Sequence, residues 1–222
     1  MTRLSFGPLR TRPTPQQARA VARVHVILHA TADLLGTRAP QDISTTAIAA
    51  HAGIPVSSIY RYFPTVEDLL RELYLQTAGE LRAKLFAIFD DARTHPRWQD
   101  RLRKALETQR SYLAEHPYYR PLLMAFMVSR GPLAVEDEEH DELVTFLHRR
   151  WARGEDGFHG GDARVVANTT IQIALAMEDL IAAQKDRDAS RPYSAELSRL
   201  LEGYLSSYLS NEGQATVSDR PA

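Results

Sequence analysis

Hydrophobic residues recur at steps of three and four along most of the chain, which is the period of helices that bury one face. A first helix is predicted from about Gln16 to Leu35, with Val21, Val24 and Leu28 on its apolar face. The same pattern predicts two short helices, 45–52 and 56–63, and then longer ones over 64–94, 97–115, 134–153, 162–185 and 195–209. A short apolar helix over 122–128 follows Pro117 and Pro121. The pattern therefore predicts an all-α protein.

The two short helices are separated by a tight glycine turn. Ser44 precedes the first, where its hydroxyl can accept from free backbone N–H groups, and Ile48 is on the inward side. Gly53 ends that helix because glycine enters the left-handed conformation without a Cβ clash. Ile54 then fills the space between the helices, and Pro55 comes early in the second helix, where its missing N–H costs little. This is the spacing of a helix-turn-helix, which presents a helix to the major groove of DNA.

The second short helix has one apolar side and one polar side. Ile59, Tyr62 and Phe63 are the predicted inward positions. Short hydroxyl side chains, an aromatic ring and a guanidinium suit contact with phosphates and base edges. The predicted outward positions, and candidate DNA contacts, are Val56, Ser57, Ser58, Tyr60 and Arg61.

The charge is distributed unevenly along the chain. Its net value of −1 argues against a nucleic-acid ligand, yet residues 1–63 hold seven arginines against Asp33 and Asp42, which gives +5, while the remainder carries −6. A positive end directs a protein toward phosphates. The alternative is that the arginines only keep a tail solvated.

Residues 44–70 resemble the DNA-binding domain of TetR-family transcriptional regulators. The matching positions are Ser44, Ile48-Ala49, Ala52-Gly53, Ser58 to Phe63, Pro64 and Glu67 to Leu70. The resemblance implies that Ser58 and Tyr60 contact DNA and that Thr46 occupies a position where many relatives carry a basic residue. Val66 stands where the family commonly carries a lysine that binds a phosphate, which would weaken binding and reduce its salt dependence unless Arg61 compensates.

This reading divides the chain into four parts. We expect a flexible basic arm over 1–14, a three-helix DNA-binding head over 15–63, a larger helical ligand-binding and dimerisation domain over 64–210, and a disordered tail over 211–222. The chain has no cysteine, so neither disulfides nor thiolate zinc sites are possible. It has neither an apolar run long enough to span a bilayer nor a signal peptide. We expect a cytoplasmic protein that does not interact with membranes and needs no cofactor or metal, since the acidic run around His140 is the pattern of a solvated face.

The last two long helices are apolar on most of their circumference. One domain core absorbs only part of such a surface, and a two-fold four-helix contact between two copies would absorb the rest. In the resembled family, dimers form in this region. The candidate dimer residues are Val166, Ile173, Met177, Leu197, Leu201, Tyr204 and Tyr208. The alternative is that both helices complete a monomeric bundle.

A ligand cavity is the least specific expectation. Aromatic and methionine side chains make adaptable apolar cavities, although at helical spacing they are also ordinary core residues. The candidates on the helices that usually surround a TetR-family ligand are Phe89, Tyr112, Met124, Met127, Phe146 and Trp151. Asn168, Gln172 and Glu178 are polar groups on a largely apolar helix, and they either orient a ligand or satisfy each other across a dimer interface.

Together these features predict a homodimeric, ligand-responsive regulator that binds double-stranded DNA. The resemblance implies a repressor that a small-molecule effector releases from an inverted-repeat operator. One alternative is a regulator of the same type that a partner protein controls. The other is an enzyme, for which the sequence offers no nucleophile elbow, phosphate loop or metal-spaced His/Glu pair.

Overall fold

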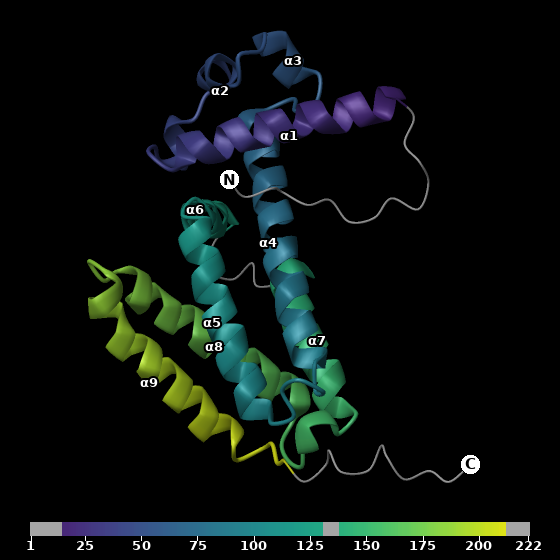
Figure 1. Ribbon diagram of the computed structural model, residues 1–222, viewed down its shortest axis with the longest axis vertical. Helices are drawn as coiled ribbons and strands as arrows, with labels where there is room; N and C mark the ends of the chain where they lie inside the picture. The colour runs from purple at the N-terminus through teal and green to yellow at the C-terminus, as the bar shows by residue number, and fades with distance from the viewer. Residues whose placement is uncertain (1–14, 131–137, 212–222) are drawn as a thin grey trace. The chain divides into compact units, whose positions relative to one another are not determined.

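A computed structural model describes residues 15–130 and 138–211 (Figure 1). Within these two ranges every regular element is an α-helix or a short 3₁₀ turn, so the predicted all-α fold is confirmed. The predicted arm over 1–14 and nearly all of the predicted tail over 211–222 lie outside the described residues. The chain forms two compact units: unit 1 comprises 1–79 and 113–131, and unit 2 comprises 80–112 and 132–222.

Unit 1 contains the helix-turn-helix. Its elements are α1 (Pro15–Leu35), the 3₁₀ turn η1 (Pro40–Asp42), α2 (Thr45–Ala52), α3 (Val56–Tyr60), the first part of α4 (Val66–Asp90) and α6 (Tyr119–Arg130). In Figure 1, α2 and α3 form the end of unit 1 farthest from α6. The sequence predicted a longer α3, to residue 63, but the helix ends at Tyr60, and Arg61 and Tyr62 form a turn. It also predicted a break at Pro121, which instead lies in the first turn of α6, where a missing N–H is tolerated.

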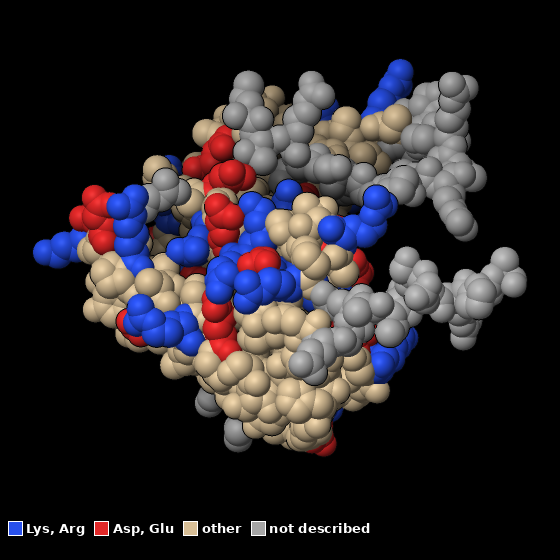
Figure 2. All heavy atoms as spheres, turned by 60° about the horizontal axis from the view of Figure 1, so that its bottom comes forward, with Lys and Arg blue, Asp and Glu red and all other residues tan. Residues whose placement is uncertain are grey.

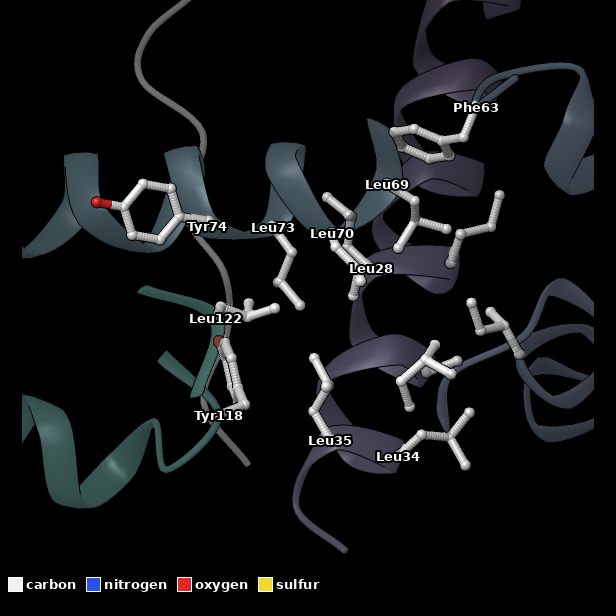
Figure 3. Close-up of a cluster of buried hydrophobic side chains, with 14 of the residues drawn as sticks. Leu28, Leu34, Leu35, Phe63, Leu69, Leu70, Leu73, Tyr74, Tyr118 and Leu122 are labelled. Carbon is white, nitrogen blue, oxygen red and sulfur yellow. The ribbon is translucent and has the colours of Figure 1, made fainter. Parts of the chain in front are cut away.

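The core of unit 1 joins segments that are far apart in sequence (Figure 3). Leu28 from α1, Leu73 from α4 and Leu122 from α6 have no exposed surface at all. Tyr118 lies just before α6 and is also buried in this cluster, and its hydroxyl lies 3.5 Å from that of Thr77. Residues 113–131 therefore pack as part of the head. The sequence-based boundary between residues 63 and 64 does not coincide with this division by packing.

Unit 2 contains the rest of α4 and most of α5 (Trp98–Glu115), followed by α7 (Glu138–Ala152), the 3₁₀ turn η2 (Glu155–Gly157), α8 (Ala163–Ala182) and α9 (Arg187–Leu205). Two aspartates cap the last two helices. The Asp162 carboxylate accepts from the backbone N–H groups of Arg164 at 2.8 Å and Val165 at 3.1 Å, and Asp186 makes the equivalent contacts at the start of α9. The sequence placed the start of the last helix near residue 195, eight residues too late.

A buried charged cluster fastens η2 inside unit 2. The Asp156 carboxylate accepts from Arg101 Nη2, from Arg150 Nε at 2.7 Å and from Trp151 Nε1 at 3.3 Å. Arg101 has no exposed surface, and the Asp156 side chain is 4% exposed. Burial opposes the charge on Arg150, but hydrogen bonds and attraction from Asp156, followed by Glu155 and Asp90, outweigh it and raise the pKa of Arg150. The backbone carbonyl of Asp156 accepts from Ser210 N at 3.2 Å, which ties the end of the described chain to the same turn.

α8 is the one described helix that is long and apolar enough to cross a membrane by these two criteria. Its Val166 and Ala167 lie in the core of unit 2, and it packs against α7 and α9. One face of α8 therefore belongs to the core of unit 2, and 33% of its apolar window is buried.

Candidate nucleic-acid interface

The turn between α2 and α3 is built by local interactions. The Ser44 hydroxyl accepts from the backbone N–H of Ala47 at 3.2 Å, which caps α2 as predicted. Gly53 has φ 63° and ψ 36°, the left-handed conformation that other residues adopt at a cost. The N–H of Ile54 then donates to the carbonyl of Ala49 at 3.0 Å, closing the helix end. Pro55 is the residue before α3 rather than its first residue.

Two isoleucines hold the pair of helices together. Ile48 of α2 and Ile59 of α3 are fully buried in the core of unit 1, and Phe63 is 7% exposed. Burying three large apolar side chains stabilises the arrangement by about 1.5–3 kcal/mol each. Because these side chains point inward, the opposite side of α3 is held outward.

The outward side of α3 carries most of the predicted DNA contacts. Ser57, Tyr60 and Arg61 are exposed, with Tyr60 at 54%. Ser58 is half-buried, and Thr46 on α2 is exposed. The prediction that Val56 points outward is only partly right, because Val56 is half-buried and packs against the core of unit 1. We call Thr46, Ser57, Ser58, Tyr60 and Arg61 the recognition face.

Tyr60 is exposed but tethered. Its hydroxyl lies 3.2 Å from Oγ1 of Thr45, the first residue of α2, whose own surface is 8% exposed. This hydrogen bond restrains the direction of the ring while about half of the residue's surface stays exposed. Sequence reasoning did not single out Thr45, because a buried hydroxyl at a helix start is ordinarily read as part of the cap.

The flanks of the recognition face are held by polar contacts. On α1, the Asp33 carboxylate lies 3.2 Å from His51 Nε2 of α2 and 3.1 Å from His29 Nδ1. At the start of α4, Thr65 and Asp68 cap each other: Asp68 N donates to Thr65 Oγ1 at 3.0 Å, and Thr65 N donates to Asp68 Oδ2 at 3.2 Å. Val66 is half-buried against the core of unit 1, so this position contributes packing and no charge.

The predicted ligand residues do not gather at one place. Trp151 and Tyr112 are 3% and 4% exposed core residues in two different clusters of unit 2. Phe89 and Phe146 are half-buried, with ring centroids 6.3 Å apart. Met124 belongs to unit 1 and is exposed, and the side chain of Met127 lies outside the described residues.

Two of the three polar candidates on α8, Asn168 and Gln172, are exposed, whereas Glu178 is only 5% exposed. Asn168 and Gln172 lie on the same helical face as Val165, which is 60% exposed, and about two to three turns before Leu180, which is 50% exposed. Asn168 and Gln172 therefore belong to the outer surface of α8.

Three of the predicted dimer residues are core residues of a single copy. Val166, Leu197 and Leu201 are 1–2% exposed and pack in the core of unit 2, so they contribute no surface to a contact between copies. The placement of these three on a dimer face is therefore wrong. Ile173, Met177, Tyr204 and Tyr208 are half-buried. The sequence misassigned the stripe because both helices are apolar on more than one side.

Metal chemistry finds no support in the described ranges. Over residues 15–130 and 138–211 there is no cluster of three or more His, Asp or Glu side chains arranged to hold a metal ion. The side chain of His140 lies outside the described residues.

Comparison with known proteins matches the head to a family. Residues 27–73 match the model of the bacterial regulatory proteins of the tetR family. These residues include all of α2 and α3, the capped start of α4 and the whole recognition face. No curated protein matches the chain.

Solved structures match far beyond the head. A TetR-family transcriptional regulator from Pectobacterium atrosepticum has a TM-score of 0.65 at 20% identity, over 89% of this chain and 98% of its own. One from Streptomyces coelicolor has a TM-score of 0.63 at 21% identity, over 84% of this chain and 99% of its own. SmeT, the repressor of the multidrug efflux pump SmeDEF of Stenotrophomonas maltophilia, has a TM-score of 0.64 at 18% identity, over 90% of this chain and 97% of its own.

The family match covers the residues that form the candidate interface, and the structural matches extend the same fold over most of both units. Residues 27–73 therefore form a DNA-binding head of the tetR family, and the chain as a whole has the fold of solved TetR-family transcriptional regulators.

Proposed function

We propose that the protein is a homodimeric repressor that binds an inverted-repeat operator through α3 and is released by a small-molecule effector bound in unit 2. The observation that carries the DNA-binding part is the exposed recognition face with the Tyr60 ring held by Thr45. A side chain that is already oriented loses less conformational entropy when it meets a base pair.

The need for two copies follows from the size of the recognition face. Helix α3 has five residues and can contact only a few base pairs, which is too little to specify a genomic site. A two-fold axis doubles the contact and requires an inverted repeat. The outer faces of α8 and α9 offer the surface for it: they expose Val165, Leu180, Tyr193 and Leu200, and Asn168 and Gln172 lie among them.

A small-molecule effector is favoured over a partner protein by an open hollow in unit 2. Unit 2 contains a hollow of about 510 Å³ beside α7, within the size range of small-molecule sites. A unit controlled only by surface contact with another protein has no need of such a space. Effector binding would act by favouring a conformation of the dimer in which the two copies of α3 no longer match successive major grooves.

The proposal also includes that the protein represses, rather than activates, transcription. Its support is the similarity in fold to SmeT, which is a repressor of an efflux pump. An exposed α3 offers a way to occupy DNA, and a repressor needs no further surface for polymerase.

The first experiment selects DNA fragments bound by the full-length protein from genomic DNA and measures affinity by gel shift. Tyr60→Ala is expected to weaken binding to the selected site by about 5–150-fold, since one base contact contributes about 1–3 kcal/mol. Tyr60→Phe keeps the ring and removes only the hydrogen bond to Thr45, so a smaller loss is expected. Ser111→Ala, exposed on α5 of unit 2, is the control. Unchanged affinity of Tyr60→Ala, with a melting temperature equal to that of the wild type, would remove α3 as the recognition helix.

The second experiment tests the dimer by sedimentation velocity. Leu180→Glu and Leu200→Glu place charges on the outer faces of α8 and α9 and are expected to produce monomers. Ala87→Glu, exposed on α4 in unit 2, should remain dimeric. A wild-type protein that sediments as a monomer at micromolar concentration, or variants that keep the mass of a dimer, would contradict this interface.

A further inference from the structure

The hollow beside α7 is lined by two kinds of side chain. Aromatic rings form one wall: Phe86 of α4 and Phe146 of α7 are stacked, with centroids 4.2 Å apart and planes 14° apart, and both are half-buried. Charged groups and the hydroxyl of Thr145 form the rest. The full lining is Phe86, Asp90, Glu142, Thr145, Phe146, Arg149, Arg150, Arg153 and Glu155, all of them in unit 2.

The carboxylates around the hollow already have cationic partners. Glu142 Oε2 lies 2.6 Å from Arg82 Nε. Asp90 and Glu155 each lie 3.0 Å from Nη1 of Arg150, whose other atoms bind the buried Asp156. On the face drawn in Figure 2, basic and acidic side chains likewise gather side by side rather than in separate patches. A cationic ligand would find no free carboxylate here.

Arg149 is different from the other lining cations. It is exposed at the hollow and makes no ion pair or hydrogen bond with any residue in the described parts of the chain. Arg153 has only a long contact, 3.9 Å, with Glu155. Thr145 and Arg149 are four residues apart on α7, so their side chains project from one face of the helix, and Arg153 is the residue that follows its end.

The formal charges leave an excess of one positive charge. The lining arginines, with Arg82 and Arg101 behind them, number five. The carboxylates they face are those of Asp90, Glu142, Glu155 and Asp156, which number four. The unmatched guanidinium is that of Arg149, a fork suited to a carboxylate or sulfonate group.

We propose that the hollow binds a small monoanion that carries an aromatic ring. Its acidic group pairs with Arg149 and can accept from the Thr145 hydroxyl, while its ring lies against Phe86 and Phe146. As the effector site, this rests on the proposed function, but as a binding site it stands on the lining alone. Uncharged and cationic aromatic compounds of the same shape are expected to bind more weakly, because they leave this guanidinium without a partner.

The test uses 2-naphthoate as probe and 2-naphthamide as its uncharged isostere, measured by titration calorimetry on the full-length protein. We expect 2-naphthoate to bind at least about tenfold more tightly, since a hydrogen bond to a charged group contributes about 1.5–3 kcal/mol. Arg149→Gln should remove that preference, while Arg97→Gln, an exposed arginine of unit 2 outside the lining, should keep it. Phe86→Leu should weaken both ligands, and a melting curve of each variant checks that unit 2 is folded.

Three results would overturn the proposal. They are equal affinities for the two probes, no binding of 2-naphthoate at millimolar concentration, and an Arg149→Gln protein that binds 2-naphthoate as the wild type does.

A gel shift with operator DNA separates this proposal from the proposed function. If 2-naphthoate binds through Arg149 without weakening the DNA complex, the hollow is a binding site for the anion but is not the effector site. If a cellular extract releases DNA equally from wild type and Arg149→Gln, the effector-controlled regulator stands and this hollow is not its site.

Discussion

Removal of the charge on Asp156 tests the buried cluster that fastens η2. The substitution Asp156→Asn replaces one carboxylate oxygen with an NH₂ group, which removes the negative charge and keeps the size and shape of the side chain. Asp156 has φ 58°, a left-handed conformation that asparagine tolerates better than most residues, so the backbone strain stays nearly constant. The change therefore isolates the charge.

The expected loss of stability follows from the hydrogen-bond and ion-pair partners that each arginine keeps. Arg150 still has Asp90 and Glu155, so it remains paired. Arg101 loses its carboxylate and keeps only the carbonyls of His95 at 2.5 Å and Pro96 at 3.0 Å, with no exposed surface through which water could solvate it. Breaking a buried ion pair costs about 3–5 kcal/mol, and the amide oxygen still accepts one hydrogen bond, so we expect about 3 kcal/mol.

The assay is thermal unfolding followed by circular dichroism. For a protein of this size 1 kcal/mol corresponds to about 2–4 °C, which predicts a fall of roughly 6–12 °C. The control is Asp100→Asn, which removes an exposed carboxylate 3.1 Å from Arg103, and it should cost less than about 1 kcal/mol because Arg103 is half exposed and still binds Glu202. If both variants melt at the same temperature, the reasoning about the buried pair is refuted.

Three further predictions concern stability. Gly157→Ala should destabilise the protein more than Gly53→Ala. Both glycines have positive φ, but a Cβ at Gly157 would lie 2.5 Å from the carbonyl oxygen of Ser210, whereas a Cβ at Gly53 would have no atom within 4 Å and only the backbone cost of about 1–2 kcal/mol remains. Equal losses of stability in urea unfolding would refute this. Leu201→Ser should lower the melting temperature without producing a folded monomer, because Leu201 is 1% exposed in the core of unit 2; a stable monomer in sedimentation would contradict it. The N–H groups of Val165 and then Arg164 lower the pKa of Asp162, so the stability that its carboxylate contributes is complete above the ordinary value of 3.8 and is lost as pH falls through the lowered value. Asp162→Asn should therefore melt below the wild type at neutral pH and approach it in acid. A constant difference in melting temperature would reject the role of the charge.

The helix-turn-helix could be predicted because its determinants are local. Ser44 and Gly53 act on backbone groups within a few residues of themselves, and Ile48 and Ile59 differ from the neighbours that point outward. Each choice is visible in a window of about ten residues. The structure accordingly has the cap, the turn and the outward side of α3 where the sequence predicted them.

The faces of α8 and α9 could not be predicted in the same way. A helix that is apolar on several sides has more than one candidate inward stripe, and the hydrophobic period alone does not choose between them. The structure buries Val166 and Leu201 and exposes Val165 and Leu200, their direct neighbours in sequence. That choice depends on where α7 and α9 pack, which no local pattern records.

The buried cluster and the hollow were missed for a related reason. Asp156 stands in a glycine-rich stretch that reads as an exposed loop, and its partner Arg101 is 55 residues away. Arg149 reads as a favourable charge at the end of a helix. Only the fold shows that the neighbouring arginines are paired with carboxylates and that Arg149 has no ion-pair partner in the described parts of the chain.

The membership of α6 in the core of unit 1 has a consequence for how the head is completed. Leu122 and Tyr118 fill space beside Leu35 and Leu73, yet residues 80–112 separate them from the rest of that core. During synthesis the core of unit 1 therefore stays incomplete until the ribosome has passed residue 122. A fragment that ends after α4 would have an apolar cavity where those two side chains belong. An isolated version of unit 1 therefore has to include the α6 segment.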